Sequence, residues 1–342
     1  MRQLVYTRPG RVEWQDAPDP QLTDQGAALI APLAVARCDL DAPMVTRGLF
    51  PGPYPVGHEV AGTVVATGPE VTRHRAGDLV IVPFQISCGH CPPCQAGTFA
   101  ASAPPTWRPS ADRSGSAPWA AATAARWPTC YSSPPPTTCS SPAPAGIQAV
   151  VLATLPDNVV DGYRSVGPPL AARPGADVLI VAAAAGSIAL YAAAAAVALG
   201  AGHVRYLDTD PHRVDAATAF GADAARHDGP WPKRFASVDI TVDVTGDADG
   251  LATVIRSTAR YGHCTSLAID FNATTPMPLL EMYTRGITFH TSRADSLRYL
   301  PDVLKLLATT AFDPLAVPTT IRPWDEAAGA WLQPATKLVI AR

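Results

Sequence analysis

The sequence predicts an α/β protein that combines a doubly wound parallel sheet with a second domain of short strands. In the second half of the chain, apolar β-branched runs alternate with helical segments, which is typical of successive βαβ units. In the first hundred residues, short apolar runs are separated by glycine and proline. A length of 342 residues is sufficient for two domains with separate cores.

The elements follow from these runs. The strands predicted in the first half cover residues 1–6, 27–35, 60–66 and 78–83. The elements predicted in the second half are, in order, a helix at 159–164, a strand at 177–181, an alanine-rich helix that starts at Gly186 and ends at Gly200, a strand at 204–208, a helix at 213–220, a strand at 238–244, a helix at 250–259, a strand near 265–268 and a closing strand at 336–340.

Composition excludes several function classes. The net charge of −3 predicts no basic face for nucleic acid or for an anionic membrane. No apolar run approaches the roughly 18 residues that a membrane-spanning helix needs. The first residues are typical of a strand rather than of a signal peptide. We therefore expect a cytoplasmic protein, in which clustered cysteines indicate metal binding before disulfides.

The chemistry-bearing motif is Gly57-His58-Glu59-Val60-Ala61-Gly62, followed by Gly68 and Val71, with Cys38 upstream. A thiol and an imidazole are ligands suited to zinc. With the spacing G-H-E-x-x-G-x(5)-G-x-x-V, the chain resembles the zinc-dependent medium-chain alcohol dehydrogenases. The resemblance implies an irregular, GroES-like β catalytic domain.

The same resemblance implies a catalytic zinc held by Cys38 and His58, with Glu59 as an exchangeable fourth ligand or a group behind the ligands. The third protein ligand of the family stands six residues before the tyrosine of a Gly-Tyr pair, and in this chain that position is Asp157. A carboxylate is an acceptable zinc donor. The alternative role for Asp157 is an N-cap of the helix at 159–164. Asp41 matches a carboxylate that orients the ligands.

The chain departs from the family at the residues that carry the proton of the alcohol away from the site. The family commonly has a Ser or Thr two residues after the first cysteine and often a histidine nearby, but this chain has Leu40 and Pro43. Water or another group must therefore carry the proton, and alcohol oxidation through the usual relay is not expected.

The strand at 177–181, the turn at Gly186, the following helix and the strand that ends in Asp208 have the Rossmann order. The acid lies 22 residues beyond Gly186 and favours NAD over NADP, because it binds a ribose 2′-hydroxyl and repels a phosphate. The glycine fingerprint falls on Ala184, Gly186 and Ala189, so only its central glycine is kept. The predicted cofactor-binding residues are Gly186, Ser187, Ile188, Asp208, Arg213 and Lys337, the last as a contact to the cofactor phosphates.

Cys88, Cys91 and Cys94 resemble the thiol loop that holds the structural zinc of the family. The fourth ligand is missing, because Ser102 stands where a cysteine is expected.

Residues 98–146 contain no Leu, Val, Ile or Met and hold three of the seven tryptophans. This composition is typical of an aberrant or disordered low-complexity insert. If the gene is rich in G and C, the same bases read one nucleotide out of frame can encode the amino-acid sequence ALADLLLVP in place of residues 126–134 and MLVP in place of residues 139–142. These alternative sequences restore the apolar strands of the family. We hypothesise a pair of compensating frame changes, near Thr98 and near Pro142, from sequencing errors or a genuine lesion.

The sequence thus predicts a GroES-like catalytic domain at 1–148, a Rossmann NAD-binding domain at 149–285 and a return to the catalytic domain at 286–342. The expected function is zinc-assisted hydride transfer between an alcohol or polyol and NAD, in a homo-oligomer that binds neither nucleic acid nor membranes. The first alternative is an impaired relic that binds nucleotide or zinc without turnover. The second is a zinc-bearing interaction protein, which would keep its partner after Cys38→Ser.

Overall fold

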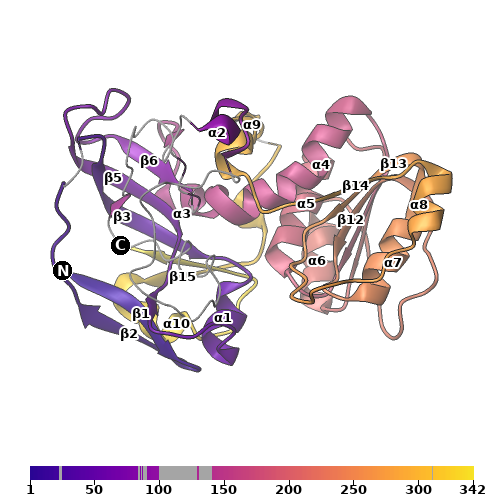
Figure 1. Ribbon diagram of the computed structural model, residues 1–342, viewed down its shortest axis with the longest axis horizontal. Coiled ribbons are helices and arrows are strands. Elements are labelled where there is room, and N and C mark those ends of the chain that lie inside the picture. The colour runs from indigo at the N-terminus through magenta and orange to yellow at the C-terminus, as the bar shows by residue number, and fades with distance from the viewer. Residues whose placement is uncertain are drawn as a thin grey trace. The chain divides into compact units, whose positions relative to one another are not determined.

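The protein is described by a computed structural model that covers residues 1–22, 25–83, 85, 87, 91–99, 129–130, 141–309 and 311–342, with the backbone alone at 129–130. The chain forms two compact units (Figure 1). The first comprises Met1–Asp157, Asp295–Pro301 and Thr319–Arg342, and the second comprises Asn158–Ala294 and Asp302–Pro318. The predicted domain limits at 148/149 and 285/286 stay a prediction. Cys88, Ser102 and most of the segment hypothesised to be out of frame lie outside the described residues.

The second unit is built on a six-stranded parallel sheet with the order β11-β10-β9-β12-β13-β14. The first strand along the chain lies inside the sheet, with strands added on both sides of it, as in a doubly wound fold. This result confirms the predicted fold class. The strands are β9 (Val178–Ala182), β10 (Val204–Asp208), β11 (Asp223–Arg226), β12 (Val238–Val244), β13 (Thr258–Ser266) and β14 (Thr288–Thr291).

Helices cover both faces of this sheet: α4, α5 and α6 lie on one side and α7 and α8 on the other (Figure 1). Every residue of β9 is buried, which explains its unbroken apolar run. Leu179 and Val181 of β9 pack against Val254 and Ile255 of α7. The helices of this unit are α4 (Val160–Ala172), α5 (Gly186–Ala198), α6 (Pro211–Ala219), α7 (Ala248–Ser257) and α8 (Leu279–Arg285), with a 3₁₀ turn at Pro314–Ala316. Helix α9 (Ser296–Ala308) begins in the first unit and ends in the second.

The first unit contains a seven-stranded mixed sheet of order β15-β16-β3-β5-β6-β8, with β7 paired to β3, and a three-stranded sheet of order β2-β1-β4. Its core forms around the fully buried Trp331, with Leu4, Val35 and Ile340. The strands are β1 (Arg2–Arg8), β2 (Arg11–Asp16), β3 (Ala28–Arg37), β4 (Tyr54–Pro55), β5 (Glu59–Thr67), β6 (Leu79–Val82), β7 (Thr129–Cys130), β8 (Ser141–Pro142), β15 (Thr319–Pro323) and β16 (Lys337–Ala341). The helices are α1 (Asp41–Arg47), α2 (Pro92–Gln95), α3 (Ala149–Thr154) and α10 (Ala327–Ala330), with a π-helix at Leu155–Val159 and a 3₁₀ turn at Trp324–Glu326.

The predicted strands that lead into the site are confirmed, and the differences lie at element ends. The helix predicted at 213–220 begins at Pro211, because the Asp210 side chain accepts the His212 N–H and caps it. The helix predicted at 250–259 ends at Ser257, because Thr258 already belongs to β13. Consequently β13 begins seven residues before the strand predicted near 265–268.

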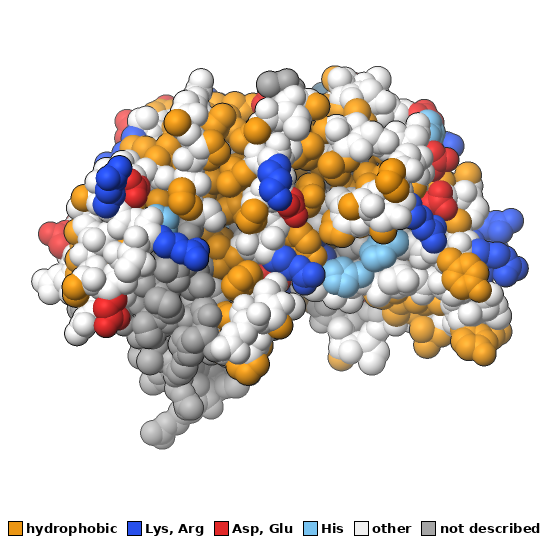
Figure 2. All heavy atoms as spheres, turned by 90° about the horizontal axis from the view of Figure 1, so that it is seen from above, with side chains coloured by type: hydrophobic (Ala, Val, Ile, Leu, Met, Phe, Trp, Pro, Cys, Tyr) orange, Lys and Arg blue, Asp and Glu red, His pale blue; other side chains and the backbone are white. Residues whose placement is uncertain are grey.

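Two surface observations concern the described residues alone. None of their helices has the length and apolar character that crossing a membrane requires. On the face shown in Figure 2, Lys and Arg side chains are dispersed among uncharged ones rather than gathered in one patch.

Candidate functional site

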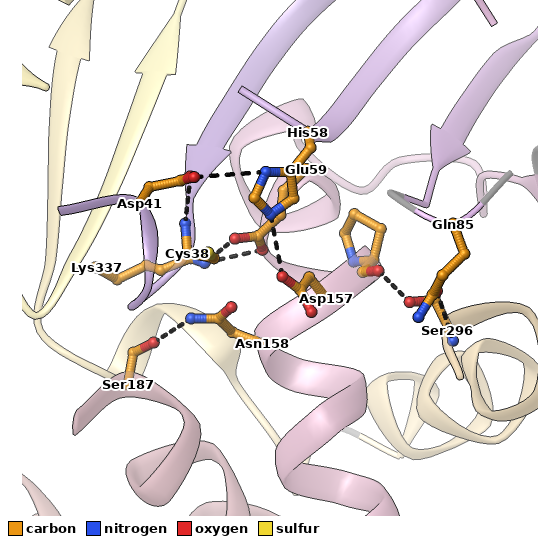
Figure 3. A network of polar contacts seen from close by, with 11 residues as sticks. Cys38, Asp41, His58, Glu59, Gln85, Asp157, Asn158, Ser187, Ser296 and Lys337 are labelled. Atoms are coloured by element: carbon orange, nitrogen blue, oxygen red, sulfur yellow. Dashed lines mark hydrogen bonds and ion pairs between the residues drawn. The ribbon is translucent and has the colours of Figure 1, made fainter. Parts of the chain in front are cut away.

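Three potential metal ligands from distant parts of the sequence lie together in the first unit (Figure 3). Cys38 directly follows β3, His58 directly precedes β5, and Asp157 lies in the π-helix between α3 and α4. One ligand atom from each residue lies within 4.8 Å of the others. Cys38 and His58 are buried, and the Asp157 side chain is 14% exposed. A π-helical turn is rare and frequently marks a functional site. The structure thus brings together the three residues that the sequence predicted as protein ligands of zinc.

Two glycines of the motif have a structural reason. Gly57 has a φ of 95°, a conformation that places His58 at the head of β5 and that other residues rarely adopt. A Cβ at Gly62 would fall 2.6 Å from the Ala31 carbonyl oxygen, so this glycine permits the close approach of β3 and β5. Both glycines therefore support the framework that presents His58.

Asp41 connects two of the three ligands. Its Oδ2 accepts the backbone N–H of Cys38 at 3.1 Å, and its Oδ1 lies 3.6 Å from Nδ1 of His58 (Figure 3). The other ring nitrogen, Nε2, lies 3.1 Å from Oδ2 of Asp157. The imidazole therefore turns Nε2 toward the other ligands while Asp41 faces Nδ1, which is how a carboxylate commonly orients a metal-binding histidine.

Burial and the neighbouring charges determine which groups of the cluster carry protons. Burial, followed by the negative charge of Asp41, raises the pKa of the Cys38 thiol to about 12. Burial acts to lower the pKa of His58, but Asp41, Cys38 and the hydrogen bond to Asp157 outweigh it and raise that pKa well above its usual value. Without a metal, protons thus occupy the sulfur and the imidazole. Metal binding must displace them.

The Asp157 carboxylate does not cap a helix. The N-cap of α4 is Val159, which makes no side-chain capping hydrogen bond, and Asp157 instead faces His58. The capping alternative is therefore wrong. A sulfur, a nitrogen and a carboxylate oxygen from three residues match a zinc centre with an open fourth position. The donor set present in the chain fits the metal.

Glu59 and Lys337 form a fully buried ion pair in the same unit. The Lys337 ammonium donates to both carboxylate oxygens of Glu59, at 2.7 and 2.8 Å, and neither side chain is exposed. Burial raises the pKa of Glu59 to about 7, against the opposing effect of Lys337. Glu59 is thus held behind the ligand cluster. The predicted contact of Lys337 with cofactor phosphates stays a prediction, and the structure commits its ammonium to Glu59.

Arg37 is a supporting residue that the sequence reasoning missed. Its guanidinium donates to the backbone oxygens of Trp331 and Gln333 at 2.7 and 2.8 Å, and to that of Ala335 at 3.3 Å. These bonds fix the segment that leads into Lys337. The available signal was a charged residue at the end of an otherwise apolar strand, only 4% exposed in the fold.

The described part of the second thiol group is compact. The sulfurs of Cys91 and Cys94 are 3.5 Å apart, close to the about 3.8 Å between two thiolates that share a tetrahedral zinc. Cys88 lies outside the described residues. The structural zinc therefore stays a prediction.

The predicted nucleotide-binding residues of the second unit lie at the carboxyl ends of β9 and β10. Gly186, Ser187 and Ile188 form the first turn of α5, whose N-cap residue makes no side-chain capping bond. Backbone amides at the N-terminus of a helix favour a phosphate. Ser187 accepts a hydrogen bond from the Asn158 amide at 2.6 Å, which supports the turn.

Asp208 ends β10, and Arg213 on α6 contacts it through two nitrogens, at 2.7 and 2.8 Å.

Among the described non-glycine residues only Tyr261 has a positive φ. Ala184 therefore needs no glycine, and the loss of the first fingerprint glycine leaves the turn unstrained.

Comparison with known proteins gives a consistent result. A sequence profile of the alcohol dehydrogenase GroES-like domain matches residues 24–128. A probable zinc-binding alcohol dehydrogenase of Mycobacterium tuberculosis is 27% identical over 96% of this chain and 84% of its own length. A glutathione-independent formaldehyde dehydrogenase of Pseudomonas aeruginosa is 31% identical over 72% of this chain, and the match spans 65% of that protein.

The fold comparison covers the whole chain. The alcohol dehydrogenase from Thermus sp. ATN1 superposes with a TM-score of 0.85 and 22% identity, over 100% of this chain and 99% of that one. At this identity the match establishes the fold. The motif, the matching profile and the relatives show that the chain belongs to the zinc-dependent medium-chain alcohol dehydrogenase family.

Proposed function

We propose that the chain is an NAD-dependent zinc dehydrogenase that transfers hydride between an alcohol or polyol and NAD. The observation that carries this proposal is the convergence of Cys38, His58 and Asp157 to within 4.8 Å of one another. Its three donor types match a catalytic centre, which keeps one position open for substrate, rather than a closed structural site. The relatives that are named alcohol dehydrogenases support the same reaction class.

Bound zinc would polarise the alcohol oxygen and lower its pKa, so that the alcohol can lose its proton near neutral pH. Side chains of the protein would balance the charge of the bound zinc ion. Cys38 and Asp157 contribute two negative charges to a divalent cation when the thiol is ionised. The Lys337 ammonium neutralises Glu59 directly behind them. Once metal binding has displaced the proton, Asp41 beside Nδ1 would keep the lone pair of His58 Nε2 directed at the cluster.

The proton must leave without the usual side-chain relay. Leu40 is the N-cap residue of α1 and packs on the apolar core of the first unit, and Pro43 lies inside that helix. Neither side chain can accept a proton. We therefore propose that water carries the proton away from the alcohol oxygen.

NAD would bind with its pyrophosphate at the first turn of α5 and its adenosine ribose near Asp208. This assignment rests on the parallel sheet, the uncapped helix start and the acid at the end of β10. NADH formation by the zinc-loaded chain with a panel of alcohols and polyols tests the proposal. Asp157→Ala should abolish turnover, whereas the exposed Asp177→Ala should leave it unchanged. Equal turnover in both variants would contradict the proposal.

The second candidate function is a relic that binds zinc or nucleotide without turnover. The composition of residues 98–146 favours it, because that segment contains no Leu, Val, Ile or Met from which a packed catalytic domain could be built. An independent nucleotide read from the codon of Cys88 to that of Ile147 separates the two candidates. Single-base changes that restore ALADLLLVP favour the enzyme, and an unchanged frame together with absent turnover favours the relic.

We also propose that the protein is a cytoplasmic homo-oligomer. The described cysteines Cys38, Cys91, Cys94 and Cys264 are not in disulfides, which suits a reducing compartment. Light scattering of the purified chain checks the oligomer, and a monomeric mass would contradict it.

A further inference from the structure

The segment that carries Asp157 lacks part of its own backbone bonding. Asp157 lies in the π-helix Leu155–Val159, directly after Pro156. A proline has no N–H, so it donates no hydrogen bond to the preceding turn of a helix. A metal site nevertheless needs its ligands held to within about 0.5 Å of the productive geometry. The position of Asp157 therefore depends in part on contacts from elsewhere in the fold.

Ser296 supplies such a contact. Its hydroxyl donates to the Pro156 carbonyl oxygen at 2.5 Å, and the two residues stand 140 positions apart in the sequence (Figure 3). This carbonyl belongs to the peptide group that joins Pro156 to Asp157. Because a peptide group is planar and includes the α-carbon of the following residue, a bond to its oxygen also restrains the α-carbon of Asp157. That α-carbon carries the carboxylate that lies 3.1 Å from Nε2 of His58.

The donor is itself fixed in place. Ser296 is the first residue of α9 and is fully buried. The first N–H groups of a helix have no partner within it, and the N–H of Ser296 donates to Oε1 of Gln85 at 3.2 Å. Gln85 is also buried. Both residues belong to the same compact unit as Asp157, so one rigid framework connects them to the ligand.

We propose that Ser296 is a positioning residue of the candidate metal centre, which holds the Asp157 carboxylate in place through the Pro156 carbonyl, with Gln85 as its support. This inference rests on the proposed function, in which Asp157 is a zinc ligand. Removing a partner that orients a metal ligand typically weakens metal binding about 10- to 100-fold. Ser296 acts on the backbone of the ligand rather than on its carboxylate, so the expected loss is near the lower limit, about tenfold.

The test compares variants of the full chain that also carry Cys91→Ser and Cys94→Ser, so that these two thiols bind no metal. Zinc affinity is measured against a competing chelator. The visible absorption spectrum with Co²⁺ in place of zinc reports the geometry of the ligands. Ser296→Ala should bind zinc about tenfold more weakly than its parent and should shift the cobalt absorption bands. Ser296→Thr keeps the hydroxyl and should restore both.

The matched control is Ser257→Ala on α7, in the second unit. Ser257 is equally buried, and its hydroxyl donates to the backbone oxygen of Thr253 at 2.8 Å. The control thus removes a buried bond of the same kind, and it should change neither the zinc affinity nor the cobalt spectrum. A general loss of stability would weaken metal binding in both alanine variants, whereas a loss of positioning affects Ser296→Ala alone.

A further variant keeps the proposal testable if Ser296→Ala does not fold. Gln85→Met removes the acceptor of the Ser296 N–H but leaves the hydroxyl, so zinc affinity should fall by a smaller factor. Unchanged metal binding in folded Ser296→Ala or Gln85→Met, equal changes in the control, or a folded Ser296→Thr that behaves like Ser296→Ala overturns the positioning role. The proposed zinc centre then still stands if the parent binds zinc. If the parent binds neither zinc nor cobalt, both proposals fail.

Discussion

The orienting role of Asp41 can be tested by one atom-for-atom exchange. Asp41→Asn keeps the shape of the side chain and leaves one oxygen to accept the Cys38 N–H, which lies at 3.1 Å. The amide nitrogen then faces Nδ1 of His58, now 3.6 Å from a carboxylate oxygen. A donor in that position favours the tautomer whose proton sits on Nε2, the nitrogen directed at the ligand cluster.

The expected loss follows from this geometry. Of the two contacts that Asp41 makes with metal ligands, the exchange retains the one to Cys38 and reverses the one to His58. Removing an orienting partner of a metal ligand typically weakens metal binding about 10- to 100-fold. This range corresponds to about 1.4–2.7 kcal/mol of zinc-binding free energy.

The assay is a zinc titration against a competing chelator dye, with Cys91→Ser introduced in every variant so that the thiol loop does not compete. Asp39→Asn, two residues away on the same segment, makes the same chemical change and should bind zinc like the parent. The reasoning is refuted if Asp41→Asn binds zinc as tightly as Asp39→Asn.

Three further outcomes are expected. Gly162→Ala should lower the free energy of unfolding by about 1–3 kcal/mol, because the new Cβ would fall 2.7–2.9 Å from the backbone and Cβ atoms of α5; thermal denaturation checks this. Lys337→Met should cost about 3–5 kcal/mol in urea unfolding, because it leaves the buried Glu59 without its partner; a loss below 1 kcal/mol would contradict the pairing. Burial, with nearby His290, lowers the pKa of His263 below 6.5. The unfolded chain therefore binds this proton more readily, and stability should fall as pH drops through about 6.5, less so in His263→Gln, by calorimetry.

The cofactor unit was largely predictable because its signals are local. The strand β10 was predicted with the limits that the structure has, since its residues are apolar apart from the exposed Arg205 and end at a single acid, Asp208. Gly186 was likewise a local signal, because it stands directly before the alanine-rich run that forms α5. The predicted start of α6 was two residues too late. The cap by Asp210 and the proline at position 211 begin the helix there, ahead of the first helical residue predicted.

The candidate metal site was predictable only in part. Through resemblance, the motif indicated Cys38 and His58, and the position six residues before the tyrosine of a Gly-Tyr pair indicated Asp157; the structure brings the three together. Pairings across the fold were not predictable, because nothing near Lys337 indicates a partner 278 positions away in the sequence. The hydroxyl of Ser296 likewise reaches the Pro156 carbonyl across 140 positions, a contact that only the fold reveals.

The central claim is that Cys38, His58 and Asp157 hold one zinc ion. X-ray absorption spectroscopy of the zinc-loaded chain carrying Cys91→Ser and Cys94→Ser tests it most directly. We expect one sulfur at about 2.3 Å and lighter nitrogen or oxygen ligands at about 2.0–2.2 Å, with this signal lost in Asp157→Ala. A shell of several sulfurs, or a spectrum that Asp157→Ala leaves unchanged, would contradict the account.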